Sequence, residues 1–169
     1  MTTAFVTCDL LDDHPELDLQ VVSPSMDGKF FKSYGARKTF GGQVVTVKCF
    51  EDNSRVKELL ATDGTGKVLV VDGGASMRCA LMGDLIAESA VKNHWNGVVI
   101  YGCVRDVDAI AELGLGVNDL AAITRKSNRK GVGEVDISLH FGCVTIQSDH
   151  YVYADNNGIV IAKEKLVDE

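Results

Sequence analysis

The chain has 169 residues, an apolar fraction of 46% and a formal net charge of −7, which predicts one soluble globular domain, residues 1–169, with a core of its own. The acidic balance argues against nucleic acid as a direct ligand, because phosphate binding needs a basic face, and it favours a basic protein partner instead. No apolar run has the length of a membrane span and no signal core opens the chain, so we expect a cytoplasmic protein that does not enter the membrane.

The first third of the chain predicts two short helices around one strand. Thr7 is placed to cap a helix within residues 1–20, which Pro15 ends or interrupts. Residues 43–50 read Q-V-V-T-V-K-C-F and predict a strand. Asn53 or Ser54 can cap a second helix that runs to about residue 61.

The centre of the chain has the pattern of a βαβ unit. Residues 68–71 form an apolar run typical of a strand buried on both faces. Helical spacing follows, with Asp84 opening the helix, and residues 98–101 predict the second strand. Ligands of open α/β sheets bind beyond the carboxyl ends of the strands. Residues 72–74 and 102–106 are therefore expected to face one crevice.

The last third of the chain is rich in predicted strands. Asp106 is placed to cap a short helix at 107–113, and residues 117–123 predict a strand. The basic stretch 125–130, R-K-S-N-R-K, is more typical of a solvated mobile loop than of a binding site.

Further strands are expected beyond this loop, at 135–141 and 143–146, and a hairpin at 151–162 has turn chemistry suited to positive φ at 155–158. A strand-rich end beside a βαβ centre predicts a mixed sheet or two stacked sheets in an α/β protein.

The five cysteines are odd in number, widely spaced and mostly within apolar runs. They predict buried free thiols in a reducing compartment, ahead of disulfides or zinc. The histidines show no zinc-ligand spacing, and Gly73-Gly74 lacks the remaining residues of a phosphate-binding loop.

Three charged residues at the predicted carboxyl edge are candidates for chemistry. Asp84 is either an N-cap alone or part of a helix start whose backbone N–H groups, at Gly83, Asp84, Leu85 and Ile86, can hold a small anion such as a carboxylate. Arg105 offers a planar fork for a carboxylate or enolate, and Asp106 a hard oxygen ligand that suits Mg²⁺ or Mn²⁺. The alternative for Arg105 and Asp106 is a surface ion pair.

Four segments of the sequence resemble the family of the regulator of ribonuclease E activity A: F-G-G-Q-V-V-T-V-K-C-F-E-D-N at 40–53, V-L-V-V-D-G-G-A-S-M-R-C-A-L-M-G-D-L-I-A at 68–87, G-C-V-R-D-V-D at 102–108 and Y-A-D-N-N-G-I-V-I at 153–161. The resemblance implies a ββα sandwich of the swivelling phosphohistidine-domain type and a homotrimer. It also implies one of two functions. Many members are metal-dependent aldolases that cleave 4-hydroxy-4-methyl-2-oxoglutarate to pyruvate and decarboxylate oxaloacetate, whereas others inhibit ribonuclease E by binding the protein.

The resemblance also assigns roles to individual residues. Enzyme members carry Gly-Asp, twenty residues and then Arg-Asp, and this chain has Gly83-Asp84 and Arg105-Asp106 at that spacing. It implies that residues 83–86 and Arg105 bind the pyruvyl group, that Asp106 holds Mg²⁺ or Mn²⁺, and that Arg105 and Asp84 take part in catalysis. Aldolases of the family usually have an acid three residues after this aspartate, where this chain has Ala109, with Asp108 one place earlier.

Overall fold

The computed structural model describes residues 4–23 and 30–168. Its main feature is a mixed sheet of ten strands. Four of them form a parallel centre in the order β3, β4, β6, β7. These strands are Phe40–Lys48, Lys67–Asp72, Gly97–Val104 and Gly116–Ala122.

Antiparallel strands extend the sheet on both sides of this centre. Beyond β3 lie β11 (Tyr151–Asp155), β12 (Gly158–Ala162) and the short β1 (Gln20–Val21), and β2 (Lys32–Ser33) borders β7. Two more short strands join the sheet near its carboxyl edge, β5 (Ala80–Met82) on β6 and β8 (Glu134–Val135) on β3. A separate hairpin pairs β9 (Leu139–Phe141) with β10 (Val144–Ile146).

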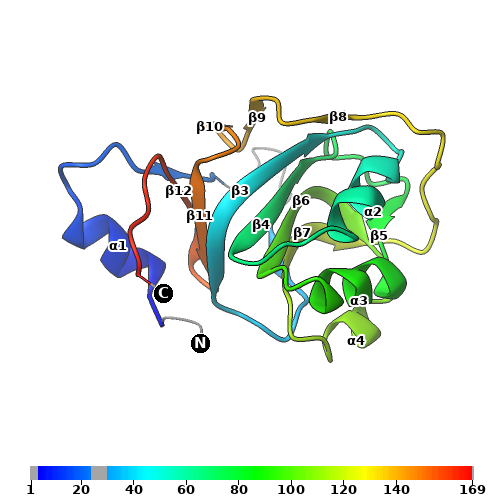
Figure 1. Ribbon diagram of the computed structural model, residues 1–169, viewed down its shortest axis with the longest axis horizontal. Coiled ribbons are helices and arrows are strands. Elements are labelled where there is room, and N and C mark those ends of the chain that lie inside the picture. The colour runs from blue at the N-terminus through cyan, green and yellow to red at the C-terminus, as the bar shows by residue number, and fades with distance from the viewer. Residues whose placement is uncertain (1–3, 24–29, 169) are drawn as a thin grey trace.

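Three helices cover one face of the parallel strands, and a fourth lies at the far end of the molecule beside β11 and β12 (Figure 1). The three are α2 (Ser54–Leu60), α3 (Asp84–Lys92) and α4 (Val107–Ile110). The fourth is α1 (Thr7–Asp13). Since β4 and β6 pair in parallel and α3 lies between them in sequence, the predicted central βαβ unit is confirmed.

The core has two layers because side chains alternate across the sheet. Val68 and Val70 of β4 pack into the cluster on the side of the β9–β10 hairpin, whereas Leu69 and Val71 pack into the cluster beneath the helices. All four are completely buried. The continuous apolar run in the sequence therefore reflects burial on both faces, as predicted.

Most predicted elements are present, with different lengths. The strands expected at 43–50, 117–123 and 151–162 correspond to β3, β7 and the β11–β12 hairpin, and α1 ends at Asp13, before Pro15. The helix expected at 107–113 is only four residues long, Val107–Ile110. Residues 80–82, just before the helix that Asp84 opens, form the extra strand β5 because they pair with β6.

The predicted side-chain caps of the first two helices are wrong. Neither Thr7 nor Asn53 makes a cap bond. The Thr7 hydroxyl instead donates to Asp155 Oδ1 at 2.7 Å, a partner far away in sequence. Helix α2 is capped one residue earlier than expected, where Asp52 Oδ1 accepts the Ser54 N–H at 2.9 Å.

The hairpin turn also differs from its prediction, since none of residues 155–158 has positive φ. The Asp155 carboxylate accepts the backbone N–H of Asn157 at 2.8 Å and so holds the turn through a side chain.

The cysteines only partly match the expectation of buried thiols. All five are unpaired, and Cys49, Cys79 and Cys103 are buried. Cys8 and Cys143 are exposed, because one lies on the outer side of α1 and the other in the β9–β10 turn, where φ is 63°. Among the helices of the described residues, none has the length and apolar character needed to cross a membrane.

Candidate active site

Both polar segments that follow the central strands lie along the carboxyl edge of the sheet, as the topology predicts. The Gly73 N–H, just after β4, donates to the Tyr101 carbonyl of β6 at 3.0 Å. The Arg105 N–H, just after β6, donates to the Met82 carbonyl at the end of β5 at 2.9 Å. The backbone thus holds Arg105-Asp106 beside the Gly83-Asp84 pair.

The Asp106 carboxylate caps a different helix from the one predicted. It makes no cap bond to α4, and Oδ2 accepts the Asp84 N–H at the start of α3, at 3.2 Å. The reason lies in the backbone: N-cap residues are normally extended, whereas Asp106 is left-handed, with φ 57° and ψ 40°. In this conformation the Asp106 carboxylate, which follows β6, accepts a hydrogen bond from the start of α3, the helix that follows β5.

Gly83 leaves room for the Asp106 carboxylate in this arrangement. A Cβ atom at Gly83 would lie 2.6 Å from Asp106 Oδ2 and 3.3 Å from Arg105 Nε. A larger residue would require the Asp106 carboxylate to shift, and that carboxylate oxygen is the one that accepts the Asp84 N–H. The Gly-Asp and Arg-Asp pairs, which are separated by twenty residues in sequence, are therefore one packed unit.

Carboxylates already accept hydrogen bonds from two backbone N–H groups at the start of α3. Besides the Asp84 N–H bound by Asp106, the Leu85 N–H donates to Asp84 Oδ1 at 2.8 Å. Two of the four amide groups predicted to hold an anion are thus engaged by the chain itself. The Leu85 side chain beside them is 75% exposed.

Arg105 and Asp106 form a loose, partly exposed ion pair, which is the alternative that the sequence allows for these two residues. Arg105 Nε lies 3.8 Å from Asp106 Oδ2, and the side chains are 38% and 41% exposed. Exposed pairs of this kind add little stability. No further ion pair or side-chain hydrogen bond of Arg105 is present within the described chain, so its terminal nitrogens remain available to a planar carboxylate.

Asp106 also retains an oxygen that fits a hard divalent cation. In residues 4–23 and 30–168, Oδ1 of Asp106 accepts no hydrogen bond, and no group of three or more His, Cys, Asp or Glu side chains converges anywhere. Mg²⁺ commonly uses one or two carboxylates and takes its other oxygens from water and substrate. One free carboxylate oxygen beside an arginine fork fits that pattern, whereas a zinc site does not.

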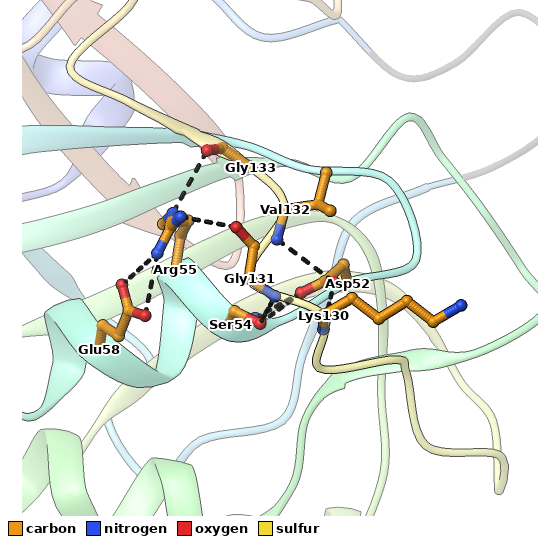
Figure 2. A network of polar contacts seen from close by, with 8 residues as sticks. All are labelled: Asp52, Ser54, Arg55, Glu58, Lys130, Gly131, Val132 and Gly133. Atoms are coloured by element: carbon orange, nitrogen blue, oxygen red, sulfur yellow. Dashed lines mark hydrogen bonds and ion pairs between the residues drawn. The ribbon is translucent and has the colours of Figure 1, made fainter.

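The basic stretch 125–130 is a largely exposed loop, as predicted, and its end is hydrogen-bonded to the start of α2; Figure 2 shows part of this network. Asp52 Oδ2 accepts the Lys130 N–H at 2.7 Å, and Ser54 Oγ accepts the Gly131 N–H at 2.9 Å. Arg55 donates to the Gly131 carbonyl at 2.6 Å. Local charge pattern could not predict these contacts, because they join segments about 77 residues apart.

Asp52 is the ionised centre of this network. Burial alone would raise the pKa of Asp52, but hydrogen bonds from the Ser54 hydroxyl and from the backbone N–H groups of Ser54, Lys130 and Val132 outweigh it and lower the pKa. Asp52 is the side chain that marks the start of α2, whereas the sequence pattern predicted that Asn53 or Ser54 would do so.

Two cavities flank the sheet, and the predicted site residues line neither. One of about 550 Å³ lies beside the carboxyl edge, with Glu51, Arg78 and Cys79 opposite the basic stretch. Another of about 710 Å³ lies at the amino ends of the parallel strands. Arg105 and Asp106 are instead on an exposed part of the carboxyl edge.

Comparison with known proteins identifies the family. A family model described as RraA-like, Aldolase/RraA, matches residues 7–161. The chain belongs to the RraA-like family. A protein of Acinetobacter baylyi with the curated name "Putative 4-hydroxy-4-methyl-2-oxoglutarate aldolase" is 75% identical over 99% of this chain and 98% of its own length. A Pseudomonas syringae protein of the same name is 54% identical over 96% of each chain.

Solved structures of the RraA-like family share the mixed α/β fold with its large sheet. The RNA-processing inhibitor RraA of Thermus thermophilis has a TM-score of 0.88 and 38% identity, with 98% of this chain and 96% of that chain covered. A protein of Geobacillus kaustophilus described as S-adenosylmethionine:2-dimethylmenaquinone methyltransferase has a TM-score of 0.90 and 41% identity, with 96% and 97% covered. Relatives with different names thus share one scaffold, and function has to be argued from the site.

Proposed function

We propose that this RraA-like protein is a divalent-metal-dependent lyase that cleaves 4-hydroxy-4-methyl-2-oxoglutarate to pyruvate and also decarboxylates oxaloacetate. The observation that carries the proposal is the contact of Gly83-Asp84 with Arg105-Asp106, in a chain 75% identical to a protein named for this aldolase activity. The contact brings an arginine fork and a free carboxylate oxygen to the edge of the sheet where α/β enzymes bind ligands.

Each residue has a part in the proposed reaction. Cleavage breaks the bond between C3 and C4 of the substrate. The C4 hydroxyl loses its proton and C4 becomes the keto carbon of one pyruvate, while the bonding electrons become the enolate of a second pyruvate. Arg105 binds the carboxylate of the pyruvyl group and stabilises this developing charge. Asp84, beside Arg105-Asp106, is proposed to help return a proton to C3.

The proposed cofactor is Mg²⁺ or Mn²⁺, held by Asp106. When bound, it would supply Lewis-acid polarisation of the 2-keto group. The Asp84 N–H holds Asp106 in place by donating to Oδ2, which leaves Oδ1 for the cation. The amide groups of residues 83–86 that remain open would orient the substrate carboxylate. Ala109 and Asp108 are both exposed on α4, so Asp108 is proposed only as a substitute for the acid usual in aldolases of the family.

A second function is favoured by a specific comparison. The Thermus protein, 38% identical over nearly the whole chain, is described as an RNA-processing inhibitor. The alternative proposal is accordingly a regulator that binds ribonuclease E as a protein partner, without catalysis. A homotrimer, the swivelling ββα sandwich, a single domain and a cytoplasmic location stay predictions under either proposal.

The metal dependence of pyruvate release distinguishes the two proposals. Purified protein is treated with a chelator, and pyruvate formation from 4-hydroxy-4-methyl-2-oxoglutarate and from oxaloacetate is followed before and after addition of Mg²⁺ or Mn²⁺. The lyase proposal predicts turnover that the chelator removes and the metal restores. If there is no turnover above the metal-catalysed background with either substrate, the regulator becomes the better account.

A further inference from the structure

The large cavity at the opposite edge of the sheet lies apart from the proposed active site. It opens at the amino ends of the parallel strands, around Phe40–Gln43 and Thr65–Gly66, whereas Arg105 and Asp106 follow the carboxyl end of β6. Its volume of about 710 Å³ is within the usual range of small-molecule sites. The chain could therefore hold a second ligand there without disturbing the first site.

The cavity contains a half-buried cation in a fixed position. Arg37 Nη1 donates to the Asn96 carbonyl at 3.2 Å. Asn96 is itself held by two hydrogen bonds. Its backbone N–H donates to the Lys67 carbonyl at 3.0 Å, and its side-chain amide donates to the Gly41 carbonyl at 2.9 Å. Burial partly desolvates the Arg37 guanidinium and so lowers its pKa.

No salt bridge to the Arg37 side chain is formed within residues 4–23 and 30–168, although the Asp168 carboxylate lines the same cavity. One N–H of the guanidinium is bound to a neutral carbonyl. A desolvated guanidinium gains most from a planar anion that accepts its remaining parallel donors. Lys165 lines the same cavity and adds a second positive charge.

Aromatic rings form much of the rest of the wall. Phe5 and Tyr153 pack edge to face, with ring centroids 5.3 Å apart, and Tyr151 lines the cavity beside them. The Tyr153 hydroxyl accepts the Leu166 N–H at 2.8 Å and so fixes the C-terminal segment that carries Lys165. The walls therefore offer ring surfaces near fixed positive charge, an environment that suits a flat apolar group attached to a carboxylate.

We propose that this amino-end cavity is a binding site for a small aromatic monocarboxylate. The carboxylate pairs with Arg37, with Lys165 as a second cation, and the ring lies against Tyr151, Phe5 and Tyr153. The site is independent of the lyase proposal, since none of its residues belongs to the Arg105 edge.

The test is calorimetric titration of the full-length protein with 3-phenylpropionate and with its neutral analogue 3-phenylpropanamide. The carboxylate is expected to bind at least about tenfold more tightly than the amide, as charge-assisted bidentate pairing requires. Arg37→Gln should weaken carboxylate binding at least about tenfold and Lys165→Gln less, because the Lys165 ammonium is an exposed point charge. Lys38→Gln is the matched control, since Lys38 is an exposed neighbour bonded to the Ser33 carbonyl, and it should bind like the parent.

Amide NMR shifts of the parent protein locate the ligand even if Arg37→Gln does not fold. Changes at residues 39–43, 94–96 and 165–168 would support the proposal. It is overturned if the parent shows no saturable binding at millimolar ligand, if the amide binds equally well, if folded Arg37→Gln binds unchanged, or if the shifts gather at residues 83–86 and 105–106.

Discussion

At the scale of single residues, the backbone of Asp106 determines what its carboxylate can do. Its left-handed conformation turns Oδ2 toward the Asp84 N–H, and the missing Cβ at Gly83 gives that oxygen room. A residue that looked like the cap of α4 in sequence therefore stabilises α3. Under the lyase proposal, Oδ2 serves as the helix cap and Oδ1 is left for the metal.

Substitution of Asp106 separates these two roles. Asp106→Asn keeps an oxygen for the Asp84 N–H but loses the negative charge, so metal-dependent turnover should fall at least about a hundredfold while stability changes little. Asp106→Ala should lose activity equally and also about 1 kcal/mol of unfolding free energy from the cap. Pyruvate assays and urea unfolding measure the two effects. Normal turnover in the folded Asp106→Asn protein would show that Asp106 holds no metal.

Asp119 on β7 is a buried acid outside the proposed site. It is completely buried, and neither oxygen has a hydrogen-bond partner of good geometry in the described structure. Burial raises its pKa to about 8, although the nearby backbone amides of Ala121 and Val104 and the charge of Lys32 act in the opposite direction. The folded protein therefore keeps this carboxyl protonated at neutral pH, whereas the unfolded chain ionises it near pH 4.

This raised pKa predicts a pH-dependent stability. The contribution of Asp119 is fully present below the unfolded pKa, declines as the pH rises and is lost as the pH passes the folded pKa of about 8. Asp119→Asn removes this titration, so its free energy of unfolding should decline less than that of the parent between pH 5 and pH 8. At pH 8 the free energy of unfolding of the variant should exceed that of the parent by at least about 1 kcal/mol. Urea unfolding at both pH values measures this, and parallel pH profiles for parent and variant would contradict it.

At the scale of elements, hydrogen bonds join the start of α2 to residues 130–133, which follow the basic stretch 125–130. Asp52 accepts hydrogen bonds from Ser54, Lys130 and Val132, and Arg55 holds the carbonyls of Gly131 and Gly133. The basic side chains of the preceding stretch are therefore presented from a fixed backbone along the 550 Å³ cavity.

Asp52→Asn tests this link. The amide can accept fewer of the N–H groups that face the carboxylate, so unfolding free energy should fall by about 1–3 kcal/mol and amide exchange at residues 130–132 should become faster. The pKa of Asp52 is lowered in the folded protein. The contribution of Asp52 to the free energy of unfolding is therefore present above its pKa in the unfolded chain and is lost as the pH falls through its pKa in the folded protein. Glu58→Gln is the control, since the exposed Glu58–Arg55 pair should contribute less than about 1 kcal/mol. Unchanged exchange in Asp52→Asn would mean that other contacts hold the loop.

The sequence was informative where structure depends on local pattern. The apolar run of β4 predicted a central strand, and the turn residues after Asp155 predicted the hairpin, because burial and turn chemistry act over a few neighbouring residues. Tertiary partners were not predictable in this way. The Thr7 hydroxyl binds Asp155, which is 148 residues away, and the basic stretch is held by Asp52. The left-handed backbone at Asp106 had no local signal either, whereas the spacing of Gly83-Asp84 from Arg105-Asp106 identified a pair that the fold does bring together.

At the scale of the whole molecule, the large sheet ends in short strands. β1 and β2 at its two edges are only two residues long, which limits pairing with other chains along the edges. Exposed apolar side chains are found elsewhere, including Leu85 beside the proposed site and Phe50 near the carboxyl edge. Contact between subunits through such side chains is consistent with the predicted trimer.

Static light scattering tests the oligomeric prediction. A trimer has three times the 18.2 kDa mass of the chain, and we expect this mass at micromolar concentration. Leu85→Glu should reduce the measured mass if Leu85 lies in a subunit interface. Val132→Glu, at another exposed apolar residue, is the matched control and should keep the mass of the parent. A parent protein that remains monomeric would contradict the prediction.

The central claim is that lyase chemistry takes place at the Arg105 edge, and one comparison of rates tests it most directly. Pyruvate release from 4-hydroxy-4-methyl-2-oxoglutarate is measured for the parent, Arg105→Ala and Arg125→Ala with saturating Mg²⁺. Loss of the Arg105 guanidinium should cost about 3 kcal/mol in the transition state, a fall of roughly a hundredfold in kcat/KM, while Arg125→Ala, beside the neighbouring cavity, stays close to the parent. Equal rates for the parent and a folded Arg105→Ala protein would contradict the account.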